Sequence, residues 1–331
     1  MEVHGYSTLL QEVPGPGMVA RRLISDDGLH NDDLGAHLVE LREWVKMKGG
    51  HSPVVADVLD HLGHVQWHYA AVNKPRDLWA CRAWAKAANA ILKIDEHTLV
   101  DDQGRVLIGP GQATGQVPVR QESLDRAERV RRELAIHDLV VPPGALPVRS
   151  TAEIRLRRPD LVGRRAVALV LTADFAISVV EGEPLDAAYM AKTFPRSFEQ
   201  RTPAERALFE ERDEELAGRL LWGYEAAAQL MAMCDRIHLG FPSDFADQGQ
   251  VWNTTLGIEE STLLPSLELV AGAEVCEEWE RARALYHTVT MALAGNSQPP
   301  VGLDREIVRQ RYRALEWLTG DEAWDDLEFE L

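Results

Sequence analysis

The densest group of potential metal ligands in the chain is a run of three histidines, His61, His64 and His68. A zinc site needs three or four ligands that converge on one point. The pattern favours a helix ending near His61 and a strand carrying the other two, so only His64 and His68 share a face. No cysteine or carboxylate lies between them. We therefore interpret the run as the polar, solvent-facing side of a sheet, and expect a metal only if folding also brought His51 close.

The other motifs that often carry chemistry are incomplete. The glycine-rich segment 109–115 resembles a phosphate loop, but it lacks the lysine and the Ser/Thr that hold a nucleotide. The nucleophile-elbow, zincin and kinase motifs are not found. Cys81 and Cys234 stand in apolar helical surroundings, which indicates core packing rather than nucleophiles. No cofactor is implied.

One carboxylate has an unusual setting. Glu225 follows Leu220 and Leu221 and precedes a run of apolar residues. Burying a carboxylate alone would raise its pKa and cost several kcal/mol, so it needs a basic partner or a solvent boundary. The last predicted helix offers Arg309, Arg311 and Arg313 as partners. A structural ion pair and a functional site both fit this pattern.

Charge is distributed unevenly along the chain. The formal net charge is −18; residues 120–165 hold 11 arginines and 7 acids, and residues 166–331 hold 31 acids and 13 bases. An acidic surface repels phosphate backbones, so we expect no nucleic-acid partner. We predict that the arginines of 120–165 pair with acids three or four residues away, namely Glu122, Asp125, Glu128 and Glu133.

Length and composition predict a globular protein of two domains. The chain has 331 residues, of which 45% are hydrophobic and 27% charged. No apolar run approaches the ~20 residues that span a bilayer, and the N-terminal residues do not resemble a secretion signal. Three scattered cysteines suit a reducing compartment. We therefore expect a cytoplasmic protein without a membrane partner.

The first part of the chain alternates between helical and strand periods, which predicts a small α+β domain with a mostly antiparallel sheet. Strands are expected near 1–7, 18–24, 65–71, 91–94, 98–100 and 105–108, and helices near 34–45, 54–62 and 78–90. An Asp101–Gly104 turn joins the last two strands. The Gly- and Pro-rich residues 109–121 predict a linker.

The remainder of the chain favours helices, so we predict a mostly α-helical C-terminal domain. Ser150 and Thr202 each begin a sequence typical of a capping box. Apolar residues from Leu208 to Cys234 keep a helical period, which predicts one long helix. A last helix follows Asp304 and ends at Gly320. The expected domains are residues 1–110, a linker and connecting helix over 111–148, and residues 149–331.

Two motifs in this region resemble a bacterial family, the domain of unknown function 4272. One is the segment 221–226 (Leu-Trp-Gly-Tyr-Glu-Ala), followed by Phe241-Pro242-Ser243 and Asp247; the other is 308–318, followed by Trp324-Asp325-Asp326. Residues 149–165 resemble the opening of that domain, and 64–107 the region often found before it. The chain departs from the pattern at 277–280 and at Glu316. The resemblance implies a soluble bacterial protein and brings no known activity.

These observations leave several functions open. The favoured hypothesis is a non-enzymatic binding or protein-interaction module whose acidic half attracts a basic protein. The alternative is an enzyme or small-ligand-binding protein with a site near Tyr224, Glu225 and Asp247, and a third is membership in a larger assembly. The sequence does not decide whether the chain is an enzyme. The candidate binding or structural network comprises Trp222, Tyr224, Glu225, Asp247, Arg309, Arg313 and Trp317.

Overall fold

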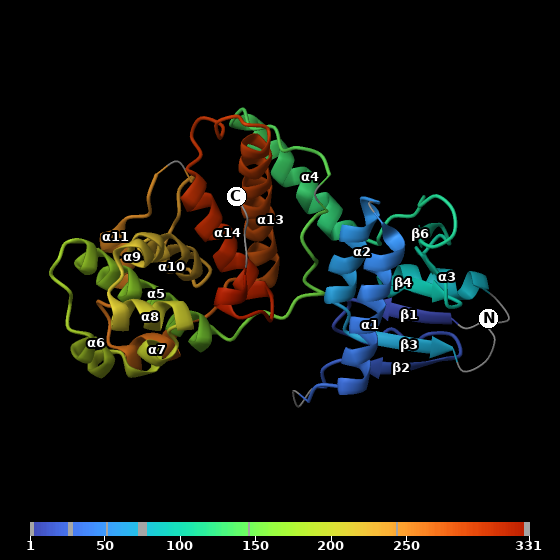
Figure 1. The fold of residues 1–331 in the computed structure, drawn as a ribbon, viewed down its shortest axis with the longest axis horizontal. Coiled ribbons are helices and arrows are strands. Elements are labelled where there is room, and N and C mark those ends of the chain that lie inside the picture. Colours follow the sequence, from blue (N-terminus) through green and yellow to red (C-terminus); the bar gives the residue numbers. More distant parts are fainter. Residues whose placement is uncertain are drawn as a thin grey trace. The chain divides into compact units, whose positions relative to one another are not determined.

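The computed structural model describes residues 3–25, 29–50, 52–71, 78–144, 146–242 and 244–327. The chain forms two compact units (Figure 1). The first consists of Met1–Leu124 and Ala152–Ile154, and the second of Asp125–Thr151 and Arg155–Leu331. His51 and Ser243, both mentioned above, lie outside the described residues.

A six-stranded sheet forms the centre of the first unit, in the order β2-β3-β1-β4-β5-β6. Every pair of neighbouring strands is antiparallel. The strands are β1 (Val3–Ser7), β2 (Met18–Arg22), β3 (Trp67–Ala71), β4 (Ala90–Ile94), β5 (Thr98–Val100) and β6 (Val106–Ile108). The helices are α1 (Asp32–Gly49), α2 (Val54–Gly63) and α3 (Leu78–Ala87). The predicted α+β class is confirmed.

Helices cover both faces of this sheet. Alternate residues of the central strand β1 point to opposite faces: Tyr6 joins a core with the apolar residues of α1 and α2, whereas Val3 joins a core with α3. Both side chains are fully buried. A sheet covered on both faces leaves no solvent-exposed side at its centre.

The prediction of a solvent-facing histidine side is therefore wrong for His68. This residue lies opposite Tyr6 in the β1–β3 register and is buried. His64 does not belong to the strand, because it follows the last residue of α2 and its ring hydrogen-bonds to the carbonyl oxygen of Asp60. The alternation of apolar and polar residues indicated one covered face, but α1 and α2 cover the other.

The glycine-rich segment after β6 packs against the first unit. The backbone N–H groups of Thr114 and Gly115 donate to the carbonyl oxygen of Val106, and that of Gln116 donates to the carboxylate of Asp101. Val117 is buried in the core beneath α1 and α2. Helix α4 (Gln121–Ile136) follows. The domain limits proposed from the sequence remain a proposal.

Among its described residues, the second unit consists of helices joined by turns and loops, without a strand. Its centre is a pair of packed helices, α5 (Pro159–Val180) and α10 (Gly223–Ala232), both buried along most of their length. Helices α13 (Gly272–Ala294) and α14 (Arg305–Thr319) pack against each other, and α14 also packs on α10. Asp304 caps α14 and Gly320 follows its last turn, as predicted.

The single long helix predicted over 208–234 is wrong, because three helices occupy this stretch. They are α8 (Pro203–Glu211), α9 (Glu214–Leu220) and α10. Arg212 adopts a left-handed conformation with φ of 55°, which ends α8, and Asp213 then caps α9. The apolar period continues across the breaks because all three helices pack on α5.

One of the two predicted capping boxes is confirmed. The Thr202 side chain accepts from the backbone N–H of Glu205, and the Glu205 side chain accepts from that of Thr202. No helix begins at Ser150, since α5 starts at Pro159. The Glu153 carboxylate instead accepts hydrogen bonds from Thr8 and Asn89, within the first unit.

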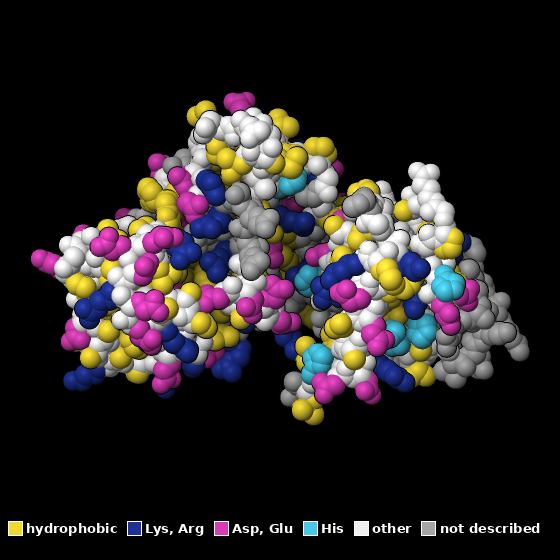
Figure 2. Space-filling view, in the orientation of Figure 1, with side chains coloured by type: hydrophobic (Ala, Val, Ile, Leu, Met, Phe, Trp, Pro, Cys, Tyr) yellow, Lys and Arg dark blue, Asp and Glu magenta, His cyan; other side chains and the backbone are white. Residues whose placement is uncertain are grey.

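Five short elements complete the second unit. They are α6 (Ala187–Thr193), α7 (Pro195–Glu199), α11 (Gln248–Thr254), α12 (Glu260–Leu263) and η2 (Trp324–Asp326), with a further 3-10 turn at Leu264–Ser266. In the described residues, no helix is both long and apolar enough to span a bilayer. On the face shown in Figure 2, acidic and basic side chains of this unit are interspersed rather than separated.

Candidate functional site

Glu225 is a buried carboxylate on α10 with a basic partner on α14. Its side chain is 3% exposed; its Oε2 accepts from Nε of Arg311 at 3.1 Å and lies 3.0 Å from Nη2 of the same guanidinium. Its Oε1 accepts the backbone N–H of Ala246 at 2.6 Å. Arg311 also donates to the carbonyl oxygen of Gly240. The pair therefore fastens the segment after α10 to α14, and both charges are satisfied inside the unit.

The other two candidate arginines have different partners. Arg309 pairs with Glu306 on its own helix at 2.5 Å. Arg313 donates to the carbonyl oxygen of Trp324 at 2.7 Å and lies 5.0 Å from the centre of that ring. Burial and the charge of Arg165 lower the pKa of Arg313 to about 10. The structure thus separates Arg313 from Glu225.

The aromatic residues of the predicted network also lie in two different places. Trp317 and Trp324 meet edge to face with ring centres 5.8 Å apart, beside Arg313. Trp222, next to Glu225 in the chain, lies instead against Phe245, 5.5 Å between ring centres. The predicted network of aromatic and charged residues is therefore two separate clusters.

Tyr224 and Asp247 do not share a site with Glu225. The Tyr224 hydroxyl donates to the carboxylate of Asp174 on α5. Burial, with Asp174 beside it, raises the pKa of Tyr224, and burial raises the pKa of Asp174. Asp247 is exposed and accepts the backbone N–H of Gln250 as the N-cap of α11. Each of the three residues contributes to helix packing or capping.

A cavity of about 250 Å³ lies beside the Glu225–Arg311 pair, within the second unit. Residues of α4, α10, α13, α14 and the segment 239–242 line it. One wall is apolar and comprises Leu239, Phe241, Pro242, Ala282, Leu285 and Val308. The other is polar and comprises Glu133, Gln229, Glu278, Arg281 and Arg311. An apolar pocket with a few convergent polar groups is typical of a small-molecule site.

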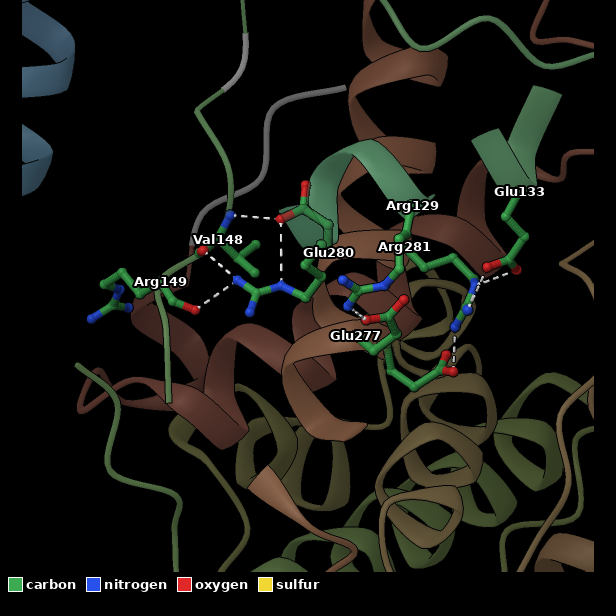
Figure 3. Close-up of polar contacts among 9 residues, drawn as sticks. Arg129, Glu133, Val148, Arg149, Glu277, Glu280 and Arg281 are labelled. Atoms are coloured by element: carbon green, nitrogen blue, oxygen red, sulfur yellow. Dashed lines mark hydrogen bonds and ion pairs between the residues drawn. The ribbon is translucent and has the colours of Figure 1, made fainter. Parts of the chain in front are cut away.

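Arg281 lies between two carboxylates on the polar wall (Figure 3). Its Nε and Nη2 each donate to an oxygen of Glu133 at 2.9 Å, and its Nη1 donates to Glu278. Burial alone would lower the pKa of Arg281, but the two carboxylates raise it, and the hydrogen bond from Arg281 lowers the pKa of Glu133. The three side chains form one fixed, charged group.

Gln229 is the polar lining residue that lacks a partner. It lies on α10, is 5% exposed, and its side chain makes no hydrogen bond with another residue that the structure describes. Because Gln229 lines the cavity, a ligand there could form a hydrogen bond with its amide group.

Two arginines of α4 pair with acids of α13, which the prediction of local pairs did not include. Arg129 meets Glu277 at 2.8 Å, and Arg126 lies 3.9 Å from Glu280 (Figure 3). Arg132 has the predicted kind of local partner, Glu128, at 3.5 Å on the same helix. Burial raises the pKa of Glu280, which accepts the backbone N–H of Val148.

The first unit carries a separate cluster of titratable rings. His4 and His68 are hydrogen-bonded at 2.9 Å, and the Tyr6 hydroxyl hydrogen-bonds to His37 at 2.9 Å. Burial and the neighbouring His37 lower the pKa of His68 to about 3. His61 lies elsewhere, with its ring hydrogen-bonded to the carbonyl oxygen of Tyr6. In the described ranges, no group of three or more His, Cys, Asp or Glu side chains could hold a metal ion.

The helical unit is thus a packed bundle with buried ion pairs and a lined cavity beside Arg311. The sequence profile of a family described as "Domain of unknown function (DUF4272)" matches residues 126–327. The chain belongs to this family. No curated protein and no solved structure matches it. The two departures from the family pattern noted in the sequence touch each other: Trp279 Nε1 donates to Glu316 Oε1 at 2.7 Å.

The sequence pattern points to few residues of the cavity lining. Glu225, which lies beside the cavity, stands out, and Arg311 is one of its three possible partners, but Gln229 and Arg281 give no signal. Polar residues are common on helix surfaces, and only the packing of α10, α13 and α14 shows which of them surround a cavity.

Proposed function

We propose that this protein is a non-enzymatic binding protein whose helical unit holds a small molecule in the cavity beside Arg311. The single observation that carries the proposal is a cavity of about 250 Å³ with an apolar and a polar wall, where Gln229 has no hydrogen-bond partner among the described residues. A cavity of this volume suits a ligand smaller than most drugs.

The use of the nearby polar residues supports binding rather than catalysis. A general acid or base must be free to reach the proton that it moves. Glu225 is fully engaged by Arg311 and Ala246, and Tyr224 is engaged by Asp174. Asp247 is engaged as a helix cap. These residues therefore have roles in helix packing and capping rather than in a reaction.

A ligand-observed NMR screen of small soluble fragments tests this function on the full chain. We expect fragments that show saturation transfer from the wild-type protein and lose it in Ala282→Phe, because the larger side chain fills the cavity. Ala294→Phe is the matched control, since Ala294 is exposed on the same helix and does not line the cavity. Hits that persist in Ala282→Phe, or a screen without hits, would count against the function.

A basic protein partner is a second candidate, supported by the 31 acids against 13 bases of residues 166–331. Such a charge speeds association with a basic surface. The test is co-purification of the full chain from its source cells at low ionic strength. A stoichiometric basic protein released by salt is expected, and its absence would reject this candidate.

A further inference from the structure

The charge around the cavity indicates which class of molecule it accepts. At the rim, Glu133 and Glu278 both pair with the single cation Arg281. Two carboxylates thus face one guanidinium, so the three side chains together carry a net charge of −1. One oxygen of Glu278 accepts from Arg281, and its other oxygen has no hydrogen bond among the described residues.

Arg311, the second cationic residue of the lining, adds no net positive charge to the cavity. Arg311 is paired with Glu225 through two contacts of 3.1 and 3.0 Å, and both side chains are nearly fully buried. Its guanidinium also donates to the carbonyl oxygen of Gly240. Arg311 therefore contributes a neutral pair, and the lining as a whole keeps one uncompensated negative charge.

The apolar wall completes the site. Phe241 presents an aromatic ring beside Leu285 and Val308, and this ring is stacked on His137 at 4.9 Å. Aromatic faces attract organic cations, and aliphatic side chains bury the apolar part of a ligand. Gln229 on α10 adds a neutral hydrogen-bond donor and acceptor to the lining.

From this arrangement we infer that the cavity binds a small organic cation, an amine with a compact apolar body, whose ammonium group contacts the Glu133–Glu278 rim. The inference rests on the proposed function. A carboxylate of the same shape would meet Glu133 and Glu278 without an unpaired cation to receive it, so the cavity should discriminate against anions.

Three probes with the same aromatic body distinguish these classes: 2-phenylethylamine, 2-phenylethanol and phenylacetate. We would titrate each into the full chain by ligand-observed NMR at one low salt concentration. The amine should bind about fivefold or more tightly than the alcohol, which corresponds to one partly exposed charge contact. Phenylacetate should bind most weakly.

Glu278→Gln tests the rim directly. This change removes the uncompensated charge while Glu133 still pairs with Arg281. The amine and the alcohol should then bind with about equal affinity. Glu277→Gln is the matched control, because Glu277 is the adjacent acid and pairs with Arg129 outside the cavity. It should leave the preference unchanged.

The outcomes separate the two proposals. If the alcohol or phenylacetate equals or exceeds the amine, and Ala282→Phe abolishes binding, the cationic class is overturned and the binding function stands. If none of the probes and none of the screened fragments binds, the function itself fails. A preference for the amine that survives Glu278→Gln also overturns the assignment of the rim.

Discussion

At the scale of single residues, the account depends on which side chains are already engaged. Glu225 was conspicuous in the sequence because a carboxylate inside an apolar segment needs a partner. Its partner could not be chosen there, since Arg309, Arg311 and Arg313 all lie on one predicted helix. Successive helical positions point about 100° apart, so the rotation of α14 against α10 selects Arg311, and that rotation comes from tertiary packing.

Replacing Glu225 by glutamine should lower the free energy of unfolding by about 3–5 kcal/mol, because the change leaves Arg311 buried without a counter-charge. Chemical denaturation of the full chain followed by circular dichroism measures the loss. Glu215→Gln, on an exposed position of α9, is the control and should change stability by less than about 0.5 kcal/mol. Equal effects of the two substitutions would show that the pair adds nothing.

Among the helices and strands, the hydrophobic periodicity of the sequence predicts which elements form better than it predicts where one helix ends and the next begins. Every predicted strand of the first unit is present, since alternation and turn residues are local signals. The breaks at Arg212 and Trp222 were missed because the apolar stripe continues through them. The sequence also does not predict the close approach of α5 to Leu264 and Leu267, which depends on Gly163.

Gly163 on α5 provides a test of this packing. A Cβ atom there would lie 2.3 Å from Leu267 Cδ1 and 2.9 Å from Leu264 Cδ2. We predict that Gly163→Ala lowers stability by about 1–3 kcal/mol through overpacking. Gly218→Ala on α9 should instead stabilise by about 0.5–1 kcal/mol, because nothing lies within 4 Å of its Cβ. Thermal unfolding of both variants measures the two effects. Shifts of the melting temperature in the same direction for both variants would contradict the packing described.

The histidines of the sheet predict a pH dependence. His68 has a pKa of about 3 in the folded chain and an ordinary value of 6.5 unfolded, and burial lowers the pKa of His61 as well. The unfolded chain therefore binds more protons below about pH 6.5. The contribution of these neutral histidines to the free energy of unfolding should be fully present above that pH. It should fall as the pH drops toward 3, by about 1.4 kcal/mol per pH unit for each histidine.

His68→Gln should flatten this slope by about one proton between about pH 5.5 and pH 4. His238→Gln, an exposed position of the second unit, should keep the wild-type slope. Denaturant unfolding at several pH values provides the comparison. Identical slopes for wild type and His68→Gln would mean that His68 titrates normally in the folded chain.

At the scale of the whole molecule, the net charge of −18 should oppose folding through self-repulsion. Salt screens this repulsion, while the buried pairs are screened much less. We predict that the melting temperature near pH 8 rises by a few degrees, roughly 2–5 °C, between about 10 and 150 mM NaCl. Near the sequence pI of 5.0 the rise should disappear. A melting temperature that falls with salt at both pH values would contradict the prediction.

A crystal structure of the full chain soaked with 2-phenylethylamine would show whether the helical unit holds a small molecule in its cavity. We expect the phenyl ring against Phe241 and Leu285, with the ammonium nitrogen about 3 Å from a carboxylate oxygen of Glu278 or Glu133. A cavity that holds only water after the soak, or a probe bound elsewhere on the chain, would contradict it.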